Sequence, residues 1–244
     1  MKKAFMILLV IVVAAAGLWF VTHKDRMPTA KTPSTAGQFN KQQYSLSDPA
    51  SLWVIVNKHR LLQPKDYAPN DLVVPDIPLR LAASSEEMHL RKPAADALQE
   101  LAAQAQKDGL KLMVASGYRS YQFQISLYNG YVQQQGKATA DSQSARPGYS
   151  EHQTGLAVDL EPTSRNCEVD PCFGDTPEGK WLAANAWKYG FIVRYQTGKQ
   201  GTTGYIAEPW HVRYVGKTLA AEVNKQGNPP LEDFFGLGAA PDYN

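Results

Sequence analysis

Residues 147–160 read PGYSEHQTGLAVDL, and this stretch sets the architecture expected for the chain. Its second half, residues 155–160, is short, apolar and rich in strand-forming side chains, which predicts a strand. Asp159 interrupts that apolar run, and burying a carboxylate there is costly unless a positive group meets it. His152 lies just before the strand, between Gly148 and Gly155. The stretch therefore predicts a buried strand with a polar site beside it.

The segments on either side of this strand mix helices and strands without a regular βαβ alternation. Leu98, Leu101 and Ala105 share one helical stripe, and Gly109 follows as a stop. By similar patterns, helices are predicted over residues 93–107, 120–135 (capped by Ser120, with Ile125, Tyr128 and Val132 facing inward), 176–189 and 217–226, and strands over 110–115, 155–160, 191–195 and 210–215. The fold class predicted is α+β, with a central, mostly antiparallel sheet flanked by helices.

The composition is that of a globular domain rather than a disordered chain. Of 244 residues, 43% are hydrophobic and 20% are charged, which is enough to bury a core. The net charge of only +2 excludes the concentrated basic face that nucleic-acid binding normally requires. Two cysteines exclude a disulfide-rich scaffold and a four-cysteine zinc site.

The N-terminal segment predicts export. Met1-Lys2-Lys3 precedes 18 uncharged, mostly apolar residues, which as a helix would span about 27 Å. Ala14-Ala15-Ala16 offers a cleavage site for a signal peptide, whereas the apolar run continues beyond it and favours an uncleaved membrane anchor. We therefore expect a signal peptide or anchor at residues 1–22, a flexible linker at 23–50 and one folded domain at 51–244, which faces the cell wall or periplasm or is secreted.

Among the five histidines, only two have acidic residues at a useful spacing. His23, His59 and His89 are interpreted as solvated or structural. His152 and His211, together with Asp159, form a two-histidine, one-carboxylate set that suits Zn²⁺ and leaves a fourth position open, as catalytic zinc sites do. The alternative is a pair of core histidines whose neighbouring acids are hydrogen-bonded.

Glu208, in the segment Glu208-Pro209-Trp210-His211, is the candidate general base beside this set. In a regular strand, residues three apart point to opposite faces, so a shared site with His211 requires a bend at Pro209. The alternative is a surface acid next to a proline. Trp210 is expected at the pocket wall.

Arg119 and the two cysteines complete the candidates. Arg119 follows a strand and precedes a helix, where it could bind a carboxylate or stabilise an oxyanion, or simply be an exposed turn residue. Cys167 and Cys172 have a spacing that permits a metal clip, but without further ligands nearby a disulfide is favoured in an exported protein.

The combined pattern resembles the VanY-like D-alanyl-D-alanine carboxypeptidases, zinc peptidases that act on bacterial cell-wall peptides. The resemblance rests on SEHQTGLAVD at residues 150–159 and on EPWH at 208–211. SGYRS at residues 116–120, VNK at 56–58 and DLV at 71–73 extend it over residues 52–216, in the family's order.

The resemblance implies that His152, Asp159 and His211 bind Zn²⁺ and that Glu208 is the catalytic base. Arg119 would contact the scissile region or the terminal carboxylate of the substrate, and Gln124 and Ser150 would line the substrate pocket. The implied fold is that of the zinc D,D-peptidases, also called the Hedgehog/DD-peptidase fold.

The implied activity is removal of the C-terminal D-alanine from peptidoglycan stem peptides. The motifs do not separate cleavage after D-alanine from cleavage after an L-diamino acid. Two alternatives stay open: a non-catalytic cell-wall-binding module and a peptidoglycan zinc endopeptidase. The expected partners are stem peptides and, through the N-terminal segment, the membrane; the expected state is a monomer.

Overall fold

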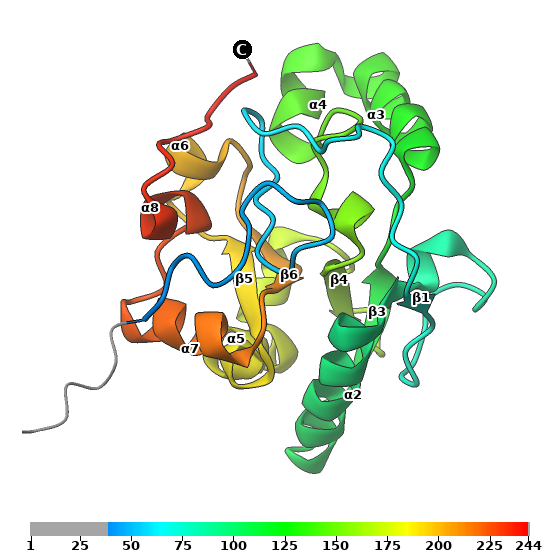
Figure 1. Cartoon of the computed structure of the whole chain (residues 1–244). Helices are drawn as coiled ribbons and strands as arrows, with labels where there is room; N and C mark the ends of the chain where they lie inside the picture. The colour runs from blue at the N-terminus through cyan, green and yellow to red at the C-terminus, as the bar shows by residue number, and fades with distance from the viewer. Residues whose placement is uncertain (1–38, 244) are drawn as a thin grey trace, which may run out of the picture. The chain divides into compact units, whose positions relative to one another are not determined.

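A four-stranded antiparallel sheet, in the order β3-β4-β6-β5, lies at the centre of the fold (Figure 1). Its strands are β3 (Leu112–Ser116), β4 (Ala157–Pro162), β6 (Glu208–Tyr214) and β5 (Phe191–Tyr195). A separate two-stranded sheet pairs β1 (Leu72–Val73) with β2 (Leu90–Arg91). This computed structural model describes residues 39–243. The predicted α+β class and the antiparallel central sheet are confirmed.

The helices follow the predicted segments closely, with three short additions. α2 (Lys92–Lys107), α3 (Tyr121–Gln135), α5 (Pro177–Asn185) and α7 (Lys217–Lys225) lie where the sequence pattern placed them. Short α4 (Lys137–Gln143), α6 (Gln200–Thr203) and α8 (Leu231–Phe235) were not predicted. The 3₁₀ turns are η2 (Glu86–Met88), η3 (Glu151–Thr154), η4 (Pro171–Asp175) and η5 (Ala186–Tyr189).

Capping residues explain why α3 and α5 begin where they do. Ser120 Oγ accepts a hydrogen bond from the Phe123 N–H, and the Thr176 hydroxyl accepts one from Gly179. Each bond satisfies a backbone donor that the first turn of a helix leaves free. The inward face of α3 differs from the predicted one: Gln124 and Tyr128 are buried, whereas Ile125 and Val132 are only partly buried. The Nε2 of the buried Gln124 has one side-chain and one backbone partner.

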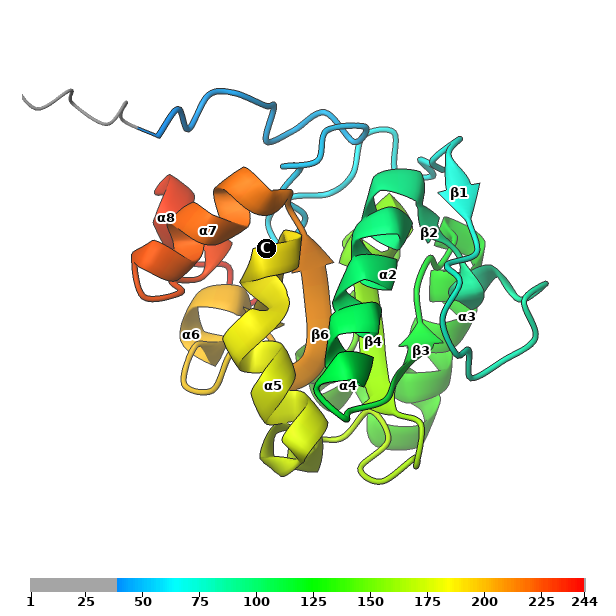
Figure 2. The ribbon, with the colours of Figure 1, turned by 90° about the horizontal axis from the view of Figure 1, so that it is seen from below.

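Alternation along the strands gives the sheet one apolar and one polar face. Val158, Leu160 and Val212 belong to the main hydrophobic core together with residues of α2 and α5. In Figure 2, α2 and α5 lie across this face of the sheet. Asp159 and His211 occupy the alternate positions, so their side chains point to the opposite face. The sheet therefore separates the packed core from the polar site.

Residues 40–50, which the sequence assigned to the linker, belong to the same compact unit as the rest of the described chain. The Leu46 carbonyl accepts hydrogen bonds from the Ile55 N–H and from Arg60 Nη2, at 3.1 and 2.8 Å. The Tyr44 ring contacts Trp53 edge-to-face, with 5.0 Å between ring centroids. The last residues of the expected linker thus pack on the domain, although their composition is that of a tether.

The predicted signal peptide or anchor at residues 1–22, His23 and the linker up to residue 38 lie outside the described residues. Within residues 39–243, no helix combines the length and the apolar character needed to cross a membrane.

Candidate active site

Strand pairing places two of the predicted metal ligands opposite each other. β4 lies between β3 and β6, and in its register Asp159 pairs directly with His211. Directly opposed residues of antiparallel strands have their Cβ atoms about 4.5–5.5 Å apart. Two side chains separated by 52 positions in the sequence are therefore brought to the same spot by backbone hydrogen bonding alone.

A tight turn before β4 brings His152 over the same spot. His152 lies in η3, which ends at Gly155 in a left-handed conformation with φ of 66°. A Cβ atom at Gly155 would lie 2.9 Å from Arg91 Cγ and 3.1 Å from a Leu72 methyl carbon, so a side chain would collide there. Glycine thus supplies both the positive φ and the space, and the turn returns the chain onto the sheet beside Asp159.

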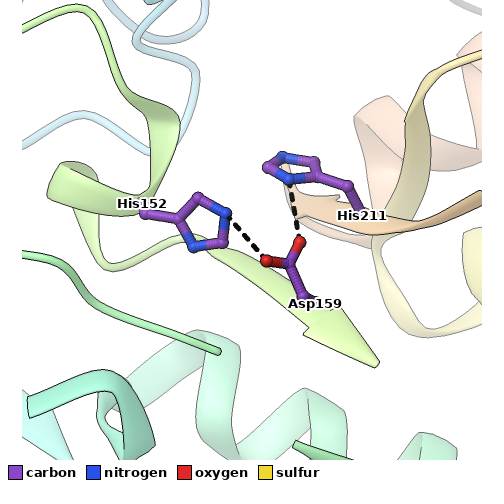
Figure 3. A group of neighbouring side chains, drawn as sticks. All are labelled: His152, Asp159 and His211. Atoms are coloured by element: carbon purple, nitrogen blue, oxygen red, sulfur yellow. Dashed lines mark ion pairs between the residues drawn. The ribbon is translucent and has the colours of Figure 1, made fainter. Parts of the chain in front are cut away.

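The three side chains converge as Figure 3 shows. His152 Nε2 lies 3.4 Å from one carboxylate oxygen of Asp159, and His211 Nδ1 lies 3.1 Å from the other. The two imidazole rings are perpendicular, with centroids 4.8 Å apart. One ligand atom from each residue lies within 4.8 Å of the other two, and all three residues are buried. This is the spacing of a set that can hold one metal ion.

Hydrogen bonds on the outer side of each ring fix which nitrogen can bind a metal. His152 Nδ1 lies 2.6 Å from the Gly117 carbonyl oxygen, which can only accept, so the proton is on Nδ1 and the lone pair is on Nε2. His211 Nε2 lies 3.4 Å from Glu151 Oε2, so when this ring is neutral its proton is on Nε2 and its lone pair is on Nδ1. Both lone pairs then face the Asp159 carboxylate, which is the arrangement of metal-binding histidines.

Unsatisfied buried atoms support the same interpretation. Within the described part of the chain, His152 Nε2 and Asp159 Oδ1 are buried and have no hydrogen-bond partner. The 3.1 Å contact between Asp159 Oδ1 and His211 Nδ1 is close but lacks the geometry of a hydrogen bond. Buried polar atoms are almost always paired, so atoms left this way point to a missing partner. A divalent cation between the three side chains fits these donor atoms.

An irregularity in β6 brings Glu208 to this group. The pairs Val193–Val212 and Tyr195–Glu208 show that four residues of β6 run alongside two residues of β5. The β5–β6 ladder is irregular between Glu208 and Val212, whereas His211 stays paired with Asp159 of β4. Glu208 Oε2 lies 3.7 Å from His211 Nδ1. The bend predicted at Pro209 is present, and it lets two residues that are three apart share one side of the strand.

Burial and charge make the site attractive to a cation. Burial lowers the pKa of His152 to about 4, with a further contribution from the Arg119 guanidinium, so this ring is neutral at pH 7. Burial raises the pKa of Glu208 to about 8, and a divalent cation beside it would favour the carboxylate form that a general base requires. Burial disfavours the charged form of His211, yet the carboxylates of Asp159 and Glu151 raise its pKa to about 9. A cation bound among these carboxylates would replace the proton of His211.

The site opens into a pocket of about 290 Å³. Arg119, Ser150, Glu208 and Trp210 line it together with the three candidate ligands. The Arg119 backbone N–H donates to the His152 carbonyl oxygen, and its guanidinium Nε is buried without a hydrogen-bond partner among the described residues. Arg119 is thus a donor inside the pocket and not an exposed turn residue.

Gln124 lies behind the pocket wall and does not line the pocket, in contrast to the expectation from the sequence. Its Nε2 donates to the Ser144 hydroxyl and to the Ala145 carbonyl, at 3.2 and 2.8 Å, and these two residues line the pocket. Its Nε2 therefore holds the wall in place, whereas its Oε1 is buried without a hydrogen-bond partner among the described residues. Ser150 lies in the lining of this pocket.

A disulfide closes the loop at one rim of the pocket. Cys167 and Cys172 are bonded, as the sequence favoured, and the residues between them include Val169, Asp170 and Pro171, which line the pocket. The Asp170 carboxylate also accepts the Cys172 N–H and caps η4. The disulfide therefore restrains a short segment of the pocket wall.

We expect the double substitution Cys167→Ser, Cys172→Ser to lower the free energy of unfolding by roughly 2 kcal/mol, the chain-entropy value for so small a loop. It should also raise KM several-fold with little change in kcat, because the loop forms the rim and does not contact the candidate metal ligands. Urea denaturation and steady-state kinetics measure both effects. A KM equal to that of the parent protein would show that the rim keeps its shape without the disulfide.

Sequence reasoning missed a group of buried charges behind the site. Glu151 is fully buried and contacts Arg194 of β5 and Arg213 of β6, at 2.9 and 3.0 Å. These two guanidinium groups overcome the effect of burial and hold the pKa of Glu151 well below its usual range. The signal was available: Arg194 and Arg213 interrupt apolar strands in the same way as Asp159 does.

A buried His-Asp-His group with a carboxylate beside it, on the polar face of an antiparallel sheet, has the ligands and the base that a zinc metallopeptidase requires. The family model of VanY, D-alanyl-D-alanine carboxypeptidase, matches residues 87–217. This chain belongs to that family, which confirms the resemblance found in the sequence. It is a carboxypeptidase of the zinc metallopeptidase class, and Zn²⁺ is its cofactor.

Known relatives agree in sequence and in structure. A D-alanyl-D-alanine carboxypeptidase of Enterococcus faecalis (strain ATCC 700802 / V583) is 33% identical over 82% of this chain and 69% of its own length. The solved LdcB LD-carboxypeptidase is 42% identical, with a TM-score of 0.73 over 77% of this chain and 87% of that chain. A vancomycin-resistance D,D-pentapeptidase VanY, solved in complex with Zn(II), is 30% identical, with a TM-score of 0.61 over 74% of this chain and 97% of that chain.

Proposed function

We propose that this protein removes the C-terminal D-alanine from peptidoglycan stem peptides and that it does so with Glu208 as the general base. The observation that carries the proposal is the position of the Glu208 carboxylate, 3.7 Å from His211 and beside the His152–Asp159–His211 group in the same pocket. A carboxylate at this distance can take a proton from a water molecule at the site.

Hydrolysis needs a metal-binding group and a general base, and different residues supply the two. His152, Asp159 and His211 would hold Zn²⁺, and the bound ion would supply Lewis-acid chemistry at the scissile carbonyl and at water. Glu208 accepts the proton of the attacking water and passes it to the amine nitrogen as the carbon–nitrogen bond breaks. The free D-alanine then leaves with that proton, and Glu208 is again a carboxylate.

Arg119 is the candidate for binding the anionic end of the substrate. Its buried Nε has no partner among the described residues, so the guanidinium can donate to an anion that enters the pocket. A C-terminal carboxylate matches the fork of a guanidinium group. Such a contact would select peptides that end at the residue to be removed, as a carboxypeptidase requires.

We further propose that the tetrapeptide stem is the preferred substrate, which makes the bond to be cut one between an L-diamino acid and D-alanine. The LD-carboxypeptidase LdcB exceeds the D,D-pentapeptidase VanY in both identity and TM-score to this chain. This support comes from similarity alone, because the motifs at the candidate site are compatible with both bonds.

Incubation of the zinc-loaded protein with a pentapeptide and a tetrapeptide stem, side by side, tests this preference. We expect loss of one D-alanine from the tetrapeptide and a kcat/KM at least tenfold lower for the pentapeptide. Mass spectrometry of the products gives both values. The reverse preference would assign D,D-specificity. Fragments larger than one amino acid would instead indicate the endopeptidase, and intact peptides in both reactions would indicate the cell-wall-binding module.

We also propose that the enzyme acts outside the cytoplasmic membrane, exported through residues 1–22. The sequence of that segment and the Cys167–Cys172 disulfide support this location, because disulfides persist in oxidising compartments. Fractionation of cells that produce the full chain, followed by detection in membrane and released fractions, would distinguish an anchor from a cleaved signal peptide.

A further inference from the structure

Four charged side chains form a closed group behind the candidate metal site. Glu151, Arg194, Arg213 and Glu232 are each no more than 1% exposed. Two acids and two bases balance one another, which is the condition under which buried charges are tolerated. Three of the four lie within residues 87–217, which the family model matches, whereas Glu232 belongs to α8, beyond them.

The contacts of Arg194 are divided between the two acids. Its Nη1 and Nη2 donate to the two oxygens of Glu232, at 2.9 and 2.6 Å, as a two-pronged fork. Its Nε donates to Glu151 Oε1 at 2.9 Å. Because the fork is occupied by Glu232, only one donor of Arg194 is directed at Glu151. Asn57 Nδ2 also donates to Glu232 Oε1, at 3.0 Å, and fixes that carboxylate from the other side.

This division leaves the second oxygen of Glu151 for the metal site. Oε1 of Glu151 accepts from both Arg194 and Arg213, whereas Oε2 faces His211 Nε2. Without the Glu232 carboxylate, the fork of Arg194 would be free to take both oxygens of Glu151, which is the preferred geometry of an arginine–carboxylate pair. Oε2 would then turn away, and His211 would lose the bond that directs Nδ1 toward Asp159.

We propose that Glu232 is a positioning residue of the metal centre, acting through Arg194 and Glu151 on the orientation of His211. α8 is then part of the active-site architecture although none of its residues lines the pocket. The inference rests on the proposed ligand role of His211. Substitution of a residue that hydrogen-bonds to a metal ligand commonly changes metal affinity 10- to 100-fold. Glu232 acts on His211 only through Arg194 and Glu151, so we expect an effect at the lower end of that range.

The test compares Glu232→Gln with Asp233→Asn in the full-length protein. Asp233 is the next residue of the same helix and is exposed, so its substitution removes an acid without touching the buried group. Zn²⁺ affinity is measured by competition with a chromophoric chelator, and the absorption spectrum of the Co²⁺-loaded protein reports ligand geometry. We expect about tenfold weaker Zn²⁺ binding and a shifted Co²⁺ spectrum for Glu232→Gln only.

A second variant covers the case in which Glu232→Gln does not fold. Glu232→Asp keeps the negative charge but shortens the side chain, so it should fold and still loosen the fork of Arg194. We expect at least threefold weaker Zn²⁺ binding for this variant. Parental affinity and an unchanged Co²⁺ spectrum in the folded variants would overturn the inference. Parental affinity in His211→Ala would instead overturn the ligand assignment on which it rests.

Discussion

Glu208→Ala is expected to bind Zn²⁺ as the parent protein does and to release D-alanine roughly 10³- to 10⁴-fold more slowly. Glu208 lies beside the candidate ligand set without belonging to the His152–Asp159–His211 group, so its removal leaves the three donor atoms in place. The side chain that accepts and returns the proton is lost, and bulk water replaces it poorly in a buried pocket. Metal content and D-alanine release, measured on one sample, give both values.

Glu178→Gln provides the matched control for this substitution. Glu178 is in the first turn of α5, away from the pocket lining, and its replacement should leave both metal content and turnover unchanged. If Glu208→Ala hydrolysed D-alanine-terminated peptides at the parental rate, the assignment of the base would be wrong. If instead it lost its metal, Glu208 would have to be counted among the ligands.

Removal of Zn²⁺ by a chelator is expected to reduce D-alanine release to background, and one equivalent of Zn²⁺ is expected to restore it. The metal should also stabilise the fold, because the ligand set is assembled only when β4, β6 and η3 are in place. With free Zn²⁺ at about 1,000 times Kd, linkage gives roughly 4 kcal/mol of added stability. Activity assays and thermal melts with and without Zn²⁺ measure the two effects.

His152→Ala separates a specific site from adventitious metal binding. This variant should stay folded but gain little stability from added Zn²⁺, and its activity should not return. Recovery of full activity by His152→Ala on addition of Zn²⁺ would contradict the ligand assignment. Retention of activity by the chelated parent protein would contradict the metal requirement itself.

The sequence was most informative where one local rule determines structure. The stripe of Leu98, Leu101 and Ala105 placed α2, and the hydroxyl of Ser120 placed the start of α3. Such signals act within a few residues, so they can be recognised without knowledge of the tertiary fold. α4 carries no such signal, because only Ala140 of its seven residues is buried, and α8 is too short to show a period.

For the site, the sequence supplied candidate residues but not their partners. Asp159 was conspicuous as a charge within an apolar strand, and the spacing of Glu208 and His211 pointed to a bend. The sequence could not predict which groups set the tautomers of the two histidines. They are the Gly117 carbonyl for His152 and the Glu151 carboxylate for His211. These contacts join segments 35 and 60 residues apart, and they depend on the folded turn geometry and not on any local pattern.

Gln124 shows the limit of transferring a role by position. The resemblance implied that it lines the substrate pocket, whereas its Nε2 donates to Ser144 and Ala145, which do line the pocket. A polar residue near a site can serve the substrate or the scaffold, and only its hydrogen-bond partners distinguish the two.

Because Asp159 pairs directly with His211, Zn²⁺ can bind tightly only when β4 and β6 are aligned in the native register. A slip of β6 by one residue against β4 would send the imidazole to the helix-covered face, and a slip by two would carry it past the carboxylate. Neither misaligned species could chelate the metal tightly. Zinc present during refolding would therefore stabilise only chains in which β4 and β6 had paired in the native register. It would raise the yield of native protein recovered from denaturant.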